Sequence, residues 1–367
     1  MQEMLLKDMF ANEKFDFAVD ENEIETPRIS PFPEHEYKAV REGIAATDLS
    51  NVLVYDVSGD EAVDYLDFVL AGSVFRLREE HILHTLCIDE QGEILSDIYV
   101  LNIDSEQYYI LADGGDYKAL DNFLRKNIGE FEVEIKDVRD AFGLFSIDGP
   151  YSPSCVKEIF GPEILGLRYL AFLPFIENGR RSYICRAGKT GEYGFWIMSP
   201  RQDSVSIFEK IWKAASETEY PTALFGRRLY ELFRLENNFF NYARVGKFTK
   251  NPFELGLFWA VELNKDMAVK NAINKIVENH VRKKIIGLRA TKGEIREGDA
   301  IFYKGEEIGR VIDTQRLFGS EEQIGLGLMD VDYGYTGLSY CAGQEPVKIQ
   351  TVNMPFLLNK SLSVKVS

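Results

Sequence analysis

The sequence is poor in the residues that build disulfide frameworks and metal centres. Its 367 residues include four cysteines and four histidines. The cysteines form no CxxC pair, and the histidines are scattered, at His35, His81, His84 and His280. These spacings indicate neither a disulfide framework nor a zinc site. Free, partly buried thiols are typical of a reducing compartment, so we expect a cytoplasmic protein.

Positive charge is also scarce. The chain has 42 Lys and Arg against 59 Asp and Glu, a net charge of −17. This excess argues against a nucleic acid or an anionic membrane as the main partner. No apolar run approaches the length of a membrane span, and the N-terminus lacks the pattern of a signal peptide. A small anionic ligand stays compatible with the composition, because a local basic pocket can exist on an acidic protein.

Common catalytic motifs are missing as well. The chain has no GxSxG elbow, no Walker loop and no GxGxxG in a strand–turn–helix context. Aromatic residues, by contrast, are plentiful, with 25 Phe and 18 Tyr, so long disordered regions are not expected. Candidate chemistry therefore rests on carboxylates, aromatic side chains and one glycine-rich stretch.

The order of predicted elements favours an α+β fold. A strand at 52–59, a helix at 61–70 and strands at 84–112 follow one another through short turns. The strand–Gly turn–helix pattern recurs at 142–160, which suggests two related subdomains. We also expect a helix over 223–236.

The length allows two or three domains. Beyond residue 281, short strands separated by glycine turns predict a small β-barrel or sandwich. We expect the polar residues 1–30 to lie over the surface. We predict three domains. Residues 1–50 and 140–280 form a first α+β unit, residues 51–139 form a second, and residues 281–367 form the barrel.

The glycine-rich stretch runs from Gly188 to Met198. Its first half alternates glycine with polar residues, and its second half, from Phe195, is apolar. The pattern is that of a turn entering a buried strand. Taken alone, it is more often a surface hairpin turn than the wall of a ligand site.

Asp97 lies within an apolar strand pattern, between Ile94 and Leu101. A carboxylate in such surroundings needs hydrogen-bond partners or a ligand. Strand alternation could equally place Asp97 on the solvent face, and periodicity does not decide between these two interpretations.

Several motifs occur together in one order. They are Glu34-His35 with Ala39-Val40-Arg41 and Asp48-Leu49-Ser50, Gly92 to Asp97, Gly149-Pro150, Gly188 to Gly194, Arg234-Leu235-Glu236, Asn251 to Val261, and Glu307 to Val311. In this order the chain resembles the aminomethyltransferase family, which comprises the glycine cleavage T-protein and its tetrahydrofolate-dependent transferase and demethylase relatives. The resemblance spans residues from about Glu34 to the end. It implies three domains around a central channel that holds folate, with a C-terminal β-barrel.

The resemblance also implies roles for particular residues. The family's pterin-facing aspartate falls on Asp97, which would orient the pterin and stabilise positive charge during one-carbon transfer. Its pterin-site tyrosine is assigned to Tyr109. Glu192, Trp196, Tyr230 and Arg234 are the other predicted cofactor-binding residues. The expected partner is a small methyl or aminomethyl donor. The T-protein also docks a lipoyl carrier protein, but no feature of this sequence identifies a surface for that partner.

This chain departs from the family pattern at several of these positions. Trp196 replaces a glutamate, Tyr230 an arginine and Lys189 a tyrosine, and Asp113-Gly114 replaces Asn-Ala. The sequence therefore predicts a divergent T-protein paralogue that binds folate differently, weakly or not at all. The two aromatic side chains would stack on the pterin or line a modified substrate pocket, or Trp196 would only pack in the core. The alternative is a non-catalytic or regulatory folate-binding protein. The iron–sulfur repair version of that alternative is disfavoured, because residues 241–248 lack its cysteine.

Overall fold

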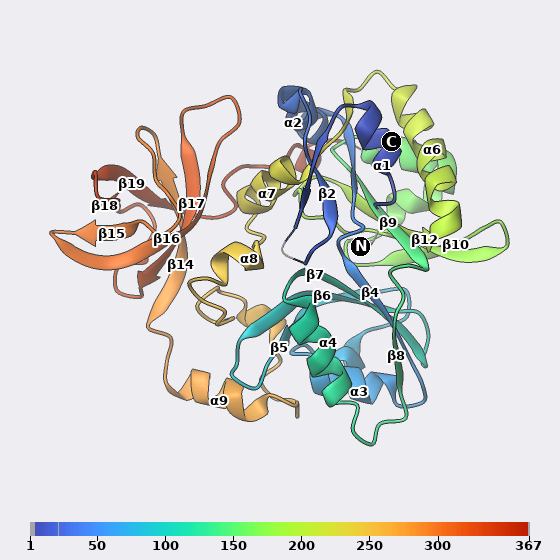
Figure 1. Ribbon diagram of the computed structural model, residues 1–367, viewed down its shortest axis with the longest axis horizontal. Helices are drawn as coiled ribbons and strands as arrows, with labels where there is room; N and C mark the ends of the chain where they lie inside the picture. The colour runs from blue at the N-terminus through green and yellow to red at the C-terminus, as the bar shows by residue number, and fades with distance from the viewer. Residues whose placement is uncertain (1–3, 21, 366–367) are drawn as a thin grey trace.

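Two open sheets and a closed barrel organise the computed structural model, which describes residues 4–20 and 22–365 (Figure 1). The six-stranded sheet has the order β10 (Phe172–Glu177), β11 (Arg180–Cys185), β12 (Gly194–Pro200), β9 (Phe142–Asp148), β3 (Ile44–Asp48) and β13 (Thr222–Leu224). The five-stranded sheet has the order β5 (Ile82–Ile88), β6 (Ile94–Asn102), β7 (Gln107–Gly115), β4 (Leu53–Ser58) and β8 (Glu134–Asp137).

The barrel closes in the order β14 (Lys283–Ala290), β17 (Gln323–Asp330), β16 (Glu306–Arg316), β15 (Ala300–Tyr303), β18 (Ser339–Ala342) and β19 (Val347–Val352). It stands to one side of the two sheets in Figure 1. The predicted α+β class and the predicted C-terminal barrel are confirmed.

The helices lie around the sheets and between the sheets and the barrel (Figure 1). They are α1 (Lys7–Asn12), α2 (Pro33–Glu42), α3 (Ala62–Val69), α4 (Tyr117–Lys126), α5 (Ser152–Phe160), α6 (Arg201–Ser216), α7 (Arg227–Glu236), α8 (Tyr242–Val245) and α9 (Lys270–Glu278). Short 3₁₀ turns are η1 (Val74–Arg76), η2 (Pro162–Gly166), η3 (Phe258–Ala260) and η4 (Lys360–Leu362). Helix α6 packs on α5, β9 and β12, and α7 and α8 lie between the sheets and the barrel (Figure 1).

The N-terminal segment is not the surface layer that its acidic composition predicted. The hairpin of β1 (Asp16–Val19) and β2 (Glu25–Ile29) follows α1, and residues such as Leu6 and Phe10 join the core beneath α6. The Leu6 amide donates to Asp48 at 2.7 Å. A few apolar residues anchor the segment, and the average composition concealed them.

The helix predicted over 223–236 begins later. Residues Thr222–Leu224 form β13, which pairs in parallel with β3, and α7 starts after Gly226. A free edge of β3 was available to this segment, so pairing outweighed helix propensity.

Two alternating strands bring the sheets together. In β12, Trp196 and Met198 join the core shared with the five-stranded sheet, whereas Phe195 and Ile197 face the core beneath α6. The ring of Trp196 meets that of Tyr99 on β6 edge-on, with centroids 4.8 Å apart. Asp97 lies two residues before Tyr99, so it faces the same side of β6. The period of two therefore places Asp97 between the sheets.

Candidate functional site

A β-bulge positions two carboxylates at the centre of the molecule. Ser96 pairs with Gly115 and Ile98 pairs with Ala112, so Asp97 alone lies opposite both Asp113 and Gly114. Gly115 has φ +100°, and a Cβ there would lie 1.9 Å from the Leu95 carbonyl oxygen. Glycine is required at this close approach. Bulges often redirect side chains next to functional sites, and here the bulge brings two acids together.

Asp97 is buried and paired at both oxygens. His84 Nε2 lies 2.6 Å from Oδ1, and Lys189 Nζ lies 2.6 Å from Oδ2. Although burial alone would raise it, the neighbouring His84 and Lys189 hold the pKa of Asp97 well below its ordinary value. The carboxylate is therefore ionised at neutral pH. Of the two interpretations left open by the strand pattern, the buried one holds.

Lys189 links the first carboxylate to the second. Its side chain is 0% exposed, and Nζ also lies 2.6 Å from Asp113 Oδ2. Arg234 Nη1 is 3.6 Å from Asp113 Oδ1, and it is 3.9 Å from Glu231 on the same helix. Burial would raise the pKa of Asp113, but the positive charges of Lys189 and Arg234 lower it overall. The result is a buried chain of alternating charges.

Aromatic rings surround these charged side chains. The Lys189 ammonium lies 5.3 Å from the centre of the Tyr99 ring, and the Arg234 guanidinium lies 5.6 Å from that of Tyr230. Trp196 completes the group through its contact with Tyr99. Both cations are thus held by ring faces as well as by carboxylates.

Three polar atoms on these rings have no hydrogen-bond partner among the described residues. They are Tyr99 Oη, Trp196 Nε1 and Tyr230 Oη. Burial raises the pKa of both tyrosines well above its ordinary value, so their hydroxyls keep their protons. Buried donors normally have partners, so these three orphaned donors are the atoms of the aromatic group that a polar ligand would satisfy.

The turn before β12 is fixed by buried hydrogen bonds. The Thr190 carbonyl accepts from Arg41 at 2.8 Å and from Asn237 at 2.7 Å. Its hydroxyl donates to Asp148 at 2.9 Å. Gly191 has φ +80°, and a Cβ there would lie 2.0 Å from Asn237 Oδ1. The glycine-rich stretch is a buried wall of the site and not a surface hairpin.

Comparison with known proteins decides the family. The GCVT N-terminal domain matches residues 10–265 of this chain. The chain belongs to the aminomethyltransferase (GCVT) family. An aminomethyltransferase of Thermotoga neapolitana is 27% identical over 277 residues, 75% of this chain and 76% of that protein. One of Thermosipho melanesiensis is 26% identical over 325 residues, 88% of each chain.

A solved structure agrees with the fold. The glycine cleavage system aminomethyltransferase T of Bartonella henselae superposes with a TM-score of 0.84 and 19% identity, over 97% of this chain and 98% of that one. The predicted α+β fold with a C-terminal barrel agrees with this match.

The predicted site residues divide into two groups. Asp97, Trp196, Tyr230 and Arg234 lie in the buried cluster. Tyr109 pairs with Leu101, four residues along β6 from Asp97, and its ring packs against Phe142 and Tyr183. At about 3.3 Å per residue, Tyr109 stands well away from Asp97 along the strand.

Glu192 has a structural role, because its hydrogen bonds are to other parts of the protein. Its carboxylate accepts from the backbone amides of Lys360 at 3.1 Å and Ser361 at 2.8 Å. Arg41 Nη1 lies 3.4 Å away, and Arg41 also pairs with Glu236. Glu192 thereby ties the C-terminal segment to the glycine-rich turn.

Five residues of the cluster were not predicted from the sequence as site residues: His84, Tyr99, Asp113, Lys189 and Glu231. His84 appeared as one of four scattered histidines, yet it stacks on Tyr99 at 4.2 Å and lies 5.0 Å from the exposed Trp259. The available signal was its position in the strand paired with Asp97's strand, where His84 lies opposite Tyr99.

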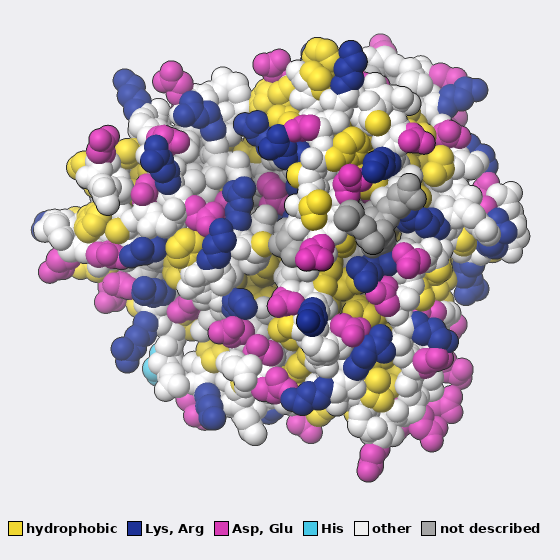
Figure 2. Space-filling view, viewed as in Figure 1, with side chains coloured by type: hydrophobic (Ala, Val, Ile, Leu, Met, Phe, Trp, Pro, Cys, Tyr) yellow, Lys and Arg dark blue, Asp and Glu magenta, His cyan; other side chains and the backbone are white. Residues whose placement is uncertain are grey.

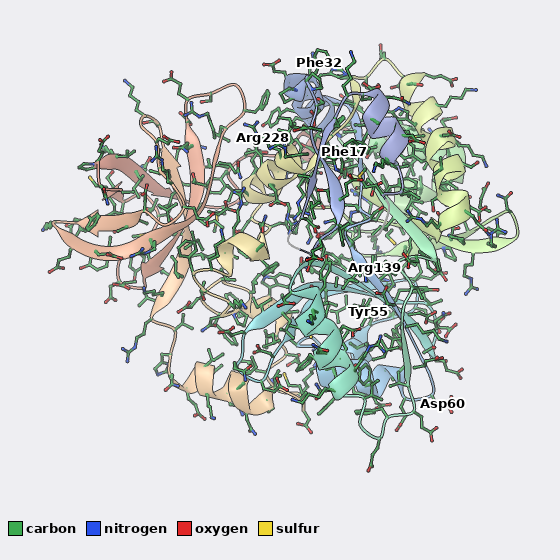
Figure 3. The ribbon with its side chains drawn as sticks, in the orientation of Figure 1. Phe17, Phe32, Tyr55, Asp60, Arg139 and Arg228 are labelled. Atoms are coloured by element: carbon green, nitrogen blue, oxygen red, sulfur yellow. The ribbon has the colours of Figure 1, made fainter. Side chains whose placement is uncertain are left out.

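A pocket of about 630 Å³ approaches the cluster from the barrel side. It lies between the β1–β2 hairpin, α7, α8 and Gln315, and Glu231 lines it. Its other charged residues are Arg28, Arg227, Arg228, Arg244, Lys247 and Asp20. Figure 3 shows Arg228 beside α7, between the hairpin and the barrel. Basic and acidic side chains intermingle over this face in Figure 2, and most cations of the pocket pair with carboxylates, as Arg28 does with Asp16 and Arg244 with Asp313.

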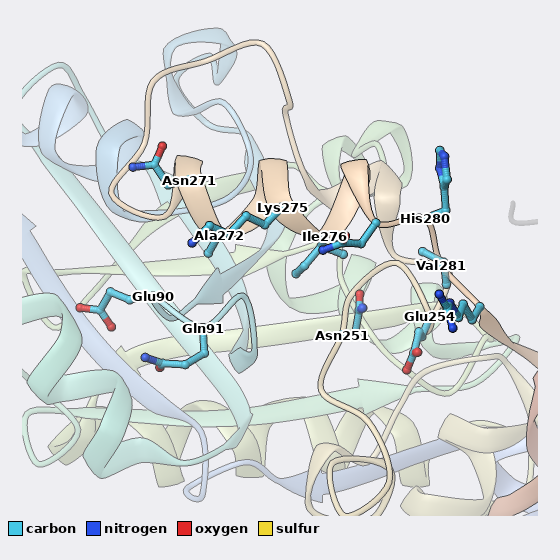
Figure 4. Close-up of a pocket in the computed structure, with 12 residues that line it drawn as sticks. Glu90, Gln91, Asn251, Glu254, Asn271, Ala272, Lys275, Ile276, His280 and Val281 are labelled. Atoms are coloured by element: carbon cyan, nitrogen blue, oxygen red, sulfur yellow. The ribbon is translucent and has the colours of Figure 1, made fainter.

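A second pocket, of about 700 Å³, lies between α9 and the β5–β6 turn. Figure 4 shows Glu90 and Gln91 of that turn facing the side of α9 that carries Ala272 and Lys275. Val281 and Arg282, which lead into β14, close one end. Neither Asp97 nor its partners line this pocket.

Among residues 4–20 and 22–365, no group of three or more His, Cys, Asp or Glu is arranged to hold a metal ion. Within the same residues, no helix is both long enough and apolar enough to span a membrane.

Proposed function

We propose that this protein is a tetrahydrofolate-dependent one-carbon transferase, a divergent T-protein paralogue that moves a methyl or aminomethyl group from a small substrate to folate. The observation that carries the proposal is the buried, ionised carboxylate of Asp97 in a chain of this family. The relatives named above are aminomethyltransferases.

The side chains of the cluster are of the chemical types that would bind a reduced pterin. A pterin is a flat ring that carries both hydrogen-bond donors and acceptors. Asp97 is an acceptor, and the orphaned donors of Tyr99, Trp196 and Tyr230 would meet ring acceptors. The same rings offer flat apolar faces for stacking. When bound, reduced folate would supply the nitrogen that exchanges the one-carbon group.

The residues of this chain would contribute position and charge. Asp97, fixed by His84, would favour positive charge that develops beside it during transfer. In a buried site such a charge interaction is strong, and holding two reactants in line supplies much of the remaining acceleration. Arg228, which lines the 630 Å³ pocket, suits a carboxylate at the glutamate end of a folate.

The first experiment is a calorimetric titration with tetrahydrofolate. Wild type should bind, and Asp97→Asn, which keeps the shape and removes the charge, should bind at least about tenfold more weakly. Asp121→Asn, at an exposed pair with Arg125, is the matched control and should bind like wild type. Absence of binding by wild type contradicts the proposal, and equal binding by Asp97→Asn removes the role of that residue.

Turnover decides between the two candidate functions. Incubation with tetrahydrofolate and a panel of small N-methyl, S-methyl and O-methyl donors should yield a one-carbon folate detectable by mass spectrometry. Lys189 already pairs with Asp97, and this observation favours the alternative, a non-catalytic folate-binding protein. Tight binding without product from any donor would support that alternative.

A further inference from the structure

Lys189 occupies the side of Asp97 that faces the second carboxylate. Its ammonium lies 2.6 Å from each of Asp97 and Asp113 and over the Tyr99 ring. The ammonium thus takes up Asp97 Oδ2 in this structure. We propose that Lys189 is a built-in competitor for Asp97: a ligand gains this carboxylate only by displacing the ammonium, which then stays with Asp113. The inference rests on the proposed function and adds to it the group that sets affinity and selects the ligand.

Only the side chain of Lys189 is free to make this move. The next residue, Thr190, is held at its carbonyl by Arg41 and Asn237 and at its hydroxyl by Asp148. The backbone of the turn is therefore fixed. The lysine stem, by contrast, has four rotatable bonds and can carry the ammonium between neighbouring acceptors.

Asp113 lowers the free-energy cost of displacing the ammonium from Asp97. An unpaired ammonium in this interior would be strongly unfavourable. Because Lys189 already contacts Asp113, leaving Asp97 costs one of two ion pairs and not both. Arg234, 3.6 Å from Asp113, supports the same carboxylate.

The competitor restricts what can bind. A ligand that replaces the ammonium at Asp97 Oδ2 has to present N–H donors or positive charge to it. Any other group would leave this buried oxygen without a partner, since His84 pairs with Oδ1. An amino-substituted heteroaromatic ring such as the pterin meets this demand, and its flat shape matches the rings of Tyr99 and Trp196. Anionic or purely apolar compounds do not.

The test is the tetrahydrofolate titration applied to Lys189→Met, which keeps an unbranched side chain of nearly the same length and removes its charge. Its dissociation constant should fall at least about tenfold below that of wild type, because no ammonium competes. Lys189→Tyr, which introduces a hydroxyl donor beside the two carboxylates, is the second variant should Lys189→Met fold poorly. Lys126→Met removes an exposed lysine paired with Glu90 and should bind like wild type.

The outcomes separate this inference from the proposed function. Equal or weaker binding by both folded Lys189 variants overturns the inference and leaves the transferase proposal intact. Binding by the variants but not by wild type supports the inference and contradicts the transferase proposal. Binding by none of the proteins overturns both. A merely structural role for Lys189 predicts weaker binding on substitution, so tighter binding is specific to competition.

Discussion

The ammonium nitrogen of Lys189 lies 2.6 Å from a carboxylate oxygen of Asp97, with neither side chain more than 5% exposed. Breaking such a pair leaves an uncompensated buried charge. We expect Lys189→Met to lower the free energy of unfolding in urea by about 3 kcal/mol, while tetrahydrofolate binding tightens. Lys126→Met, at the surface, should stay within about 0.5 kcal/mol of wild type. Unchanged stability of Lys189→Met would mean that the pair is not formed in solution.

Arg41 should be a stability residue and not a ligand residue. It pairs with the buried carboxylates of Glu192 and Glu236 and donates to the Thr190 carbonyl. Arg41→Met should therefore cost about 3–5 kcal/mol in urea unfolding. Arg125→Met, which breaks an exposed pair with Asp121, should cost no more than about 0.5 kcal/mol. Similar small losses in both variants would show that the buried network contributes little.

Restoring the family's glutamate at Trp196 should not restore the family's site. Trp196 is 1% exposed and packs against Tyr99. Trp196→Glu would bury a carboxylate without a described partner and should cost at least about 3 kcal/mol, more than Trp196→Phe. Trp259→Phe, at a half-exposed tryptophan, is the control. If Trp196→Glu is as stable as Trp196→Phe, the pocket holds a partner for the carboxylate.

Asp148 should impose a pH dependence on stability. Burial raises its pKa from 3.8 to about 6, although Ser146, Thr190, Arg186 and Arg41 act in the opposite direction. Between about pH 4 and 6 the folded protein keeps a proton that the unfolded chain releases, so the free energy of unfolding falls as pH rises through this window.

Asp148→Asn cannot titrate and should lack that decline. The difference in free energy of unfolding, wild type minus variant, should fall by roughly 2–3 kcal/mol between pH 4 and pH 7.5. Urea unfolding at four pH values measures it, and all other titrating groups are common to both proteins. Parallel pH profiles would show that Asp148 titrates normally.

Gly191 should tolerate no side chain. Its φ of +80° is unfavourable for other residues, and an added Cβ would displace Asn237, which holds the Thr190 carbonyl. Gly191→Ala should cost about 2–4 kcal/mol. Gly129 has φ +55° with open space around its Cβ position, so Gly129→Ala measures the backbone term alone and should cost about 1 kcal/mol. Equal losses would rule out crowding against Asn237.

The sequence predicts much of the fold because its strands are short, regularly patterned and joined by glycine turns. Strand β12 illustrates this: its two faces separate into the two cores as alternation requires. The N-terminal segment could not be placed the same way, since its buried residues are few and surrounded by acids. The β-strand at Thr222–Leu224 depended on an open edge of β3 that no local pattern reveals.

A site residue could be predicted only where its own local sequence was unusual. Asp97 is conspicuous as a carboxylate in an apolar strand, but β6 is buried along both faces, so alternation could not decide its environment. His84, Asp113 and Lys189 join it from separate segments of the chain. Where a long flexible lysine places its ammonium depends on those tertiary partners, and the sequence marked Lys189 only as a departure from a motif.

The most direct test of the account is a thermodynamic cycle on tetrahydrofolate binding with wild type, Asp97→Asn, Lys189→Met and the double variant. If Lys189 competes for Asp97, Lys189→Met tightens binding at least about tenfold when Asp97 is present and has little effect in the Asp97→Asn background. The same gain in both backgrounds, or no gain in either, would contradict the account.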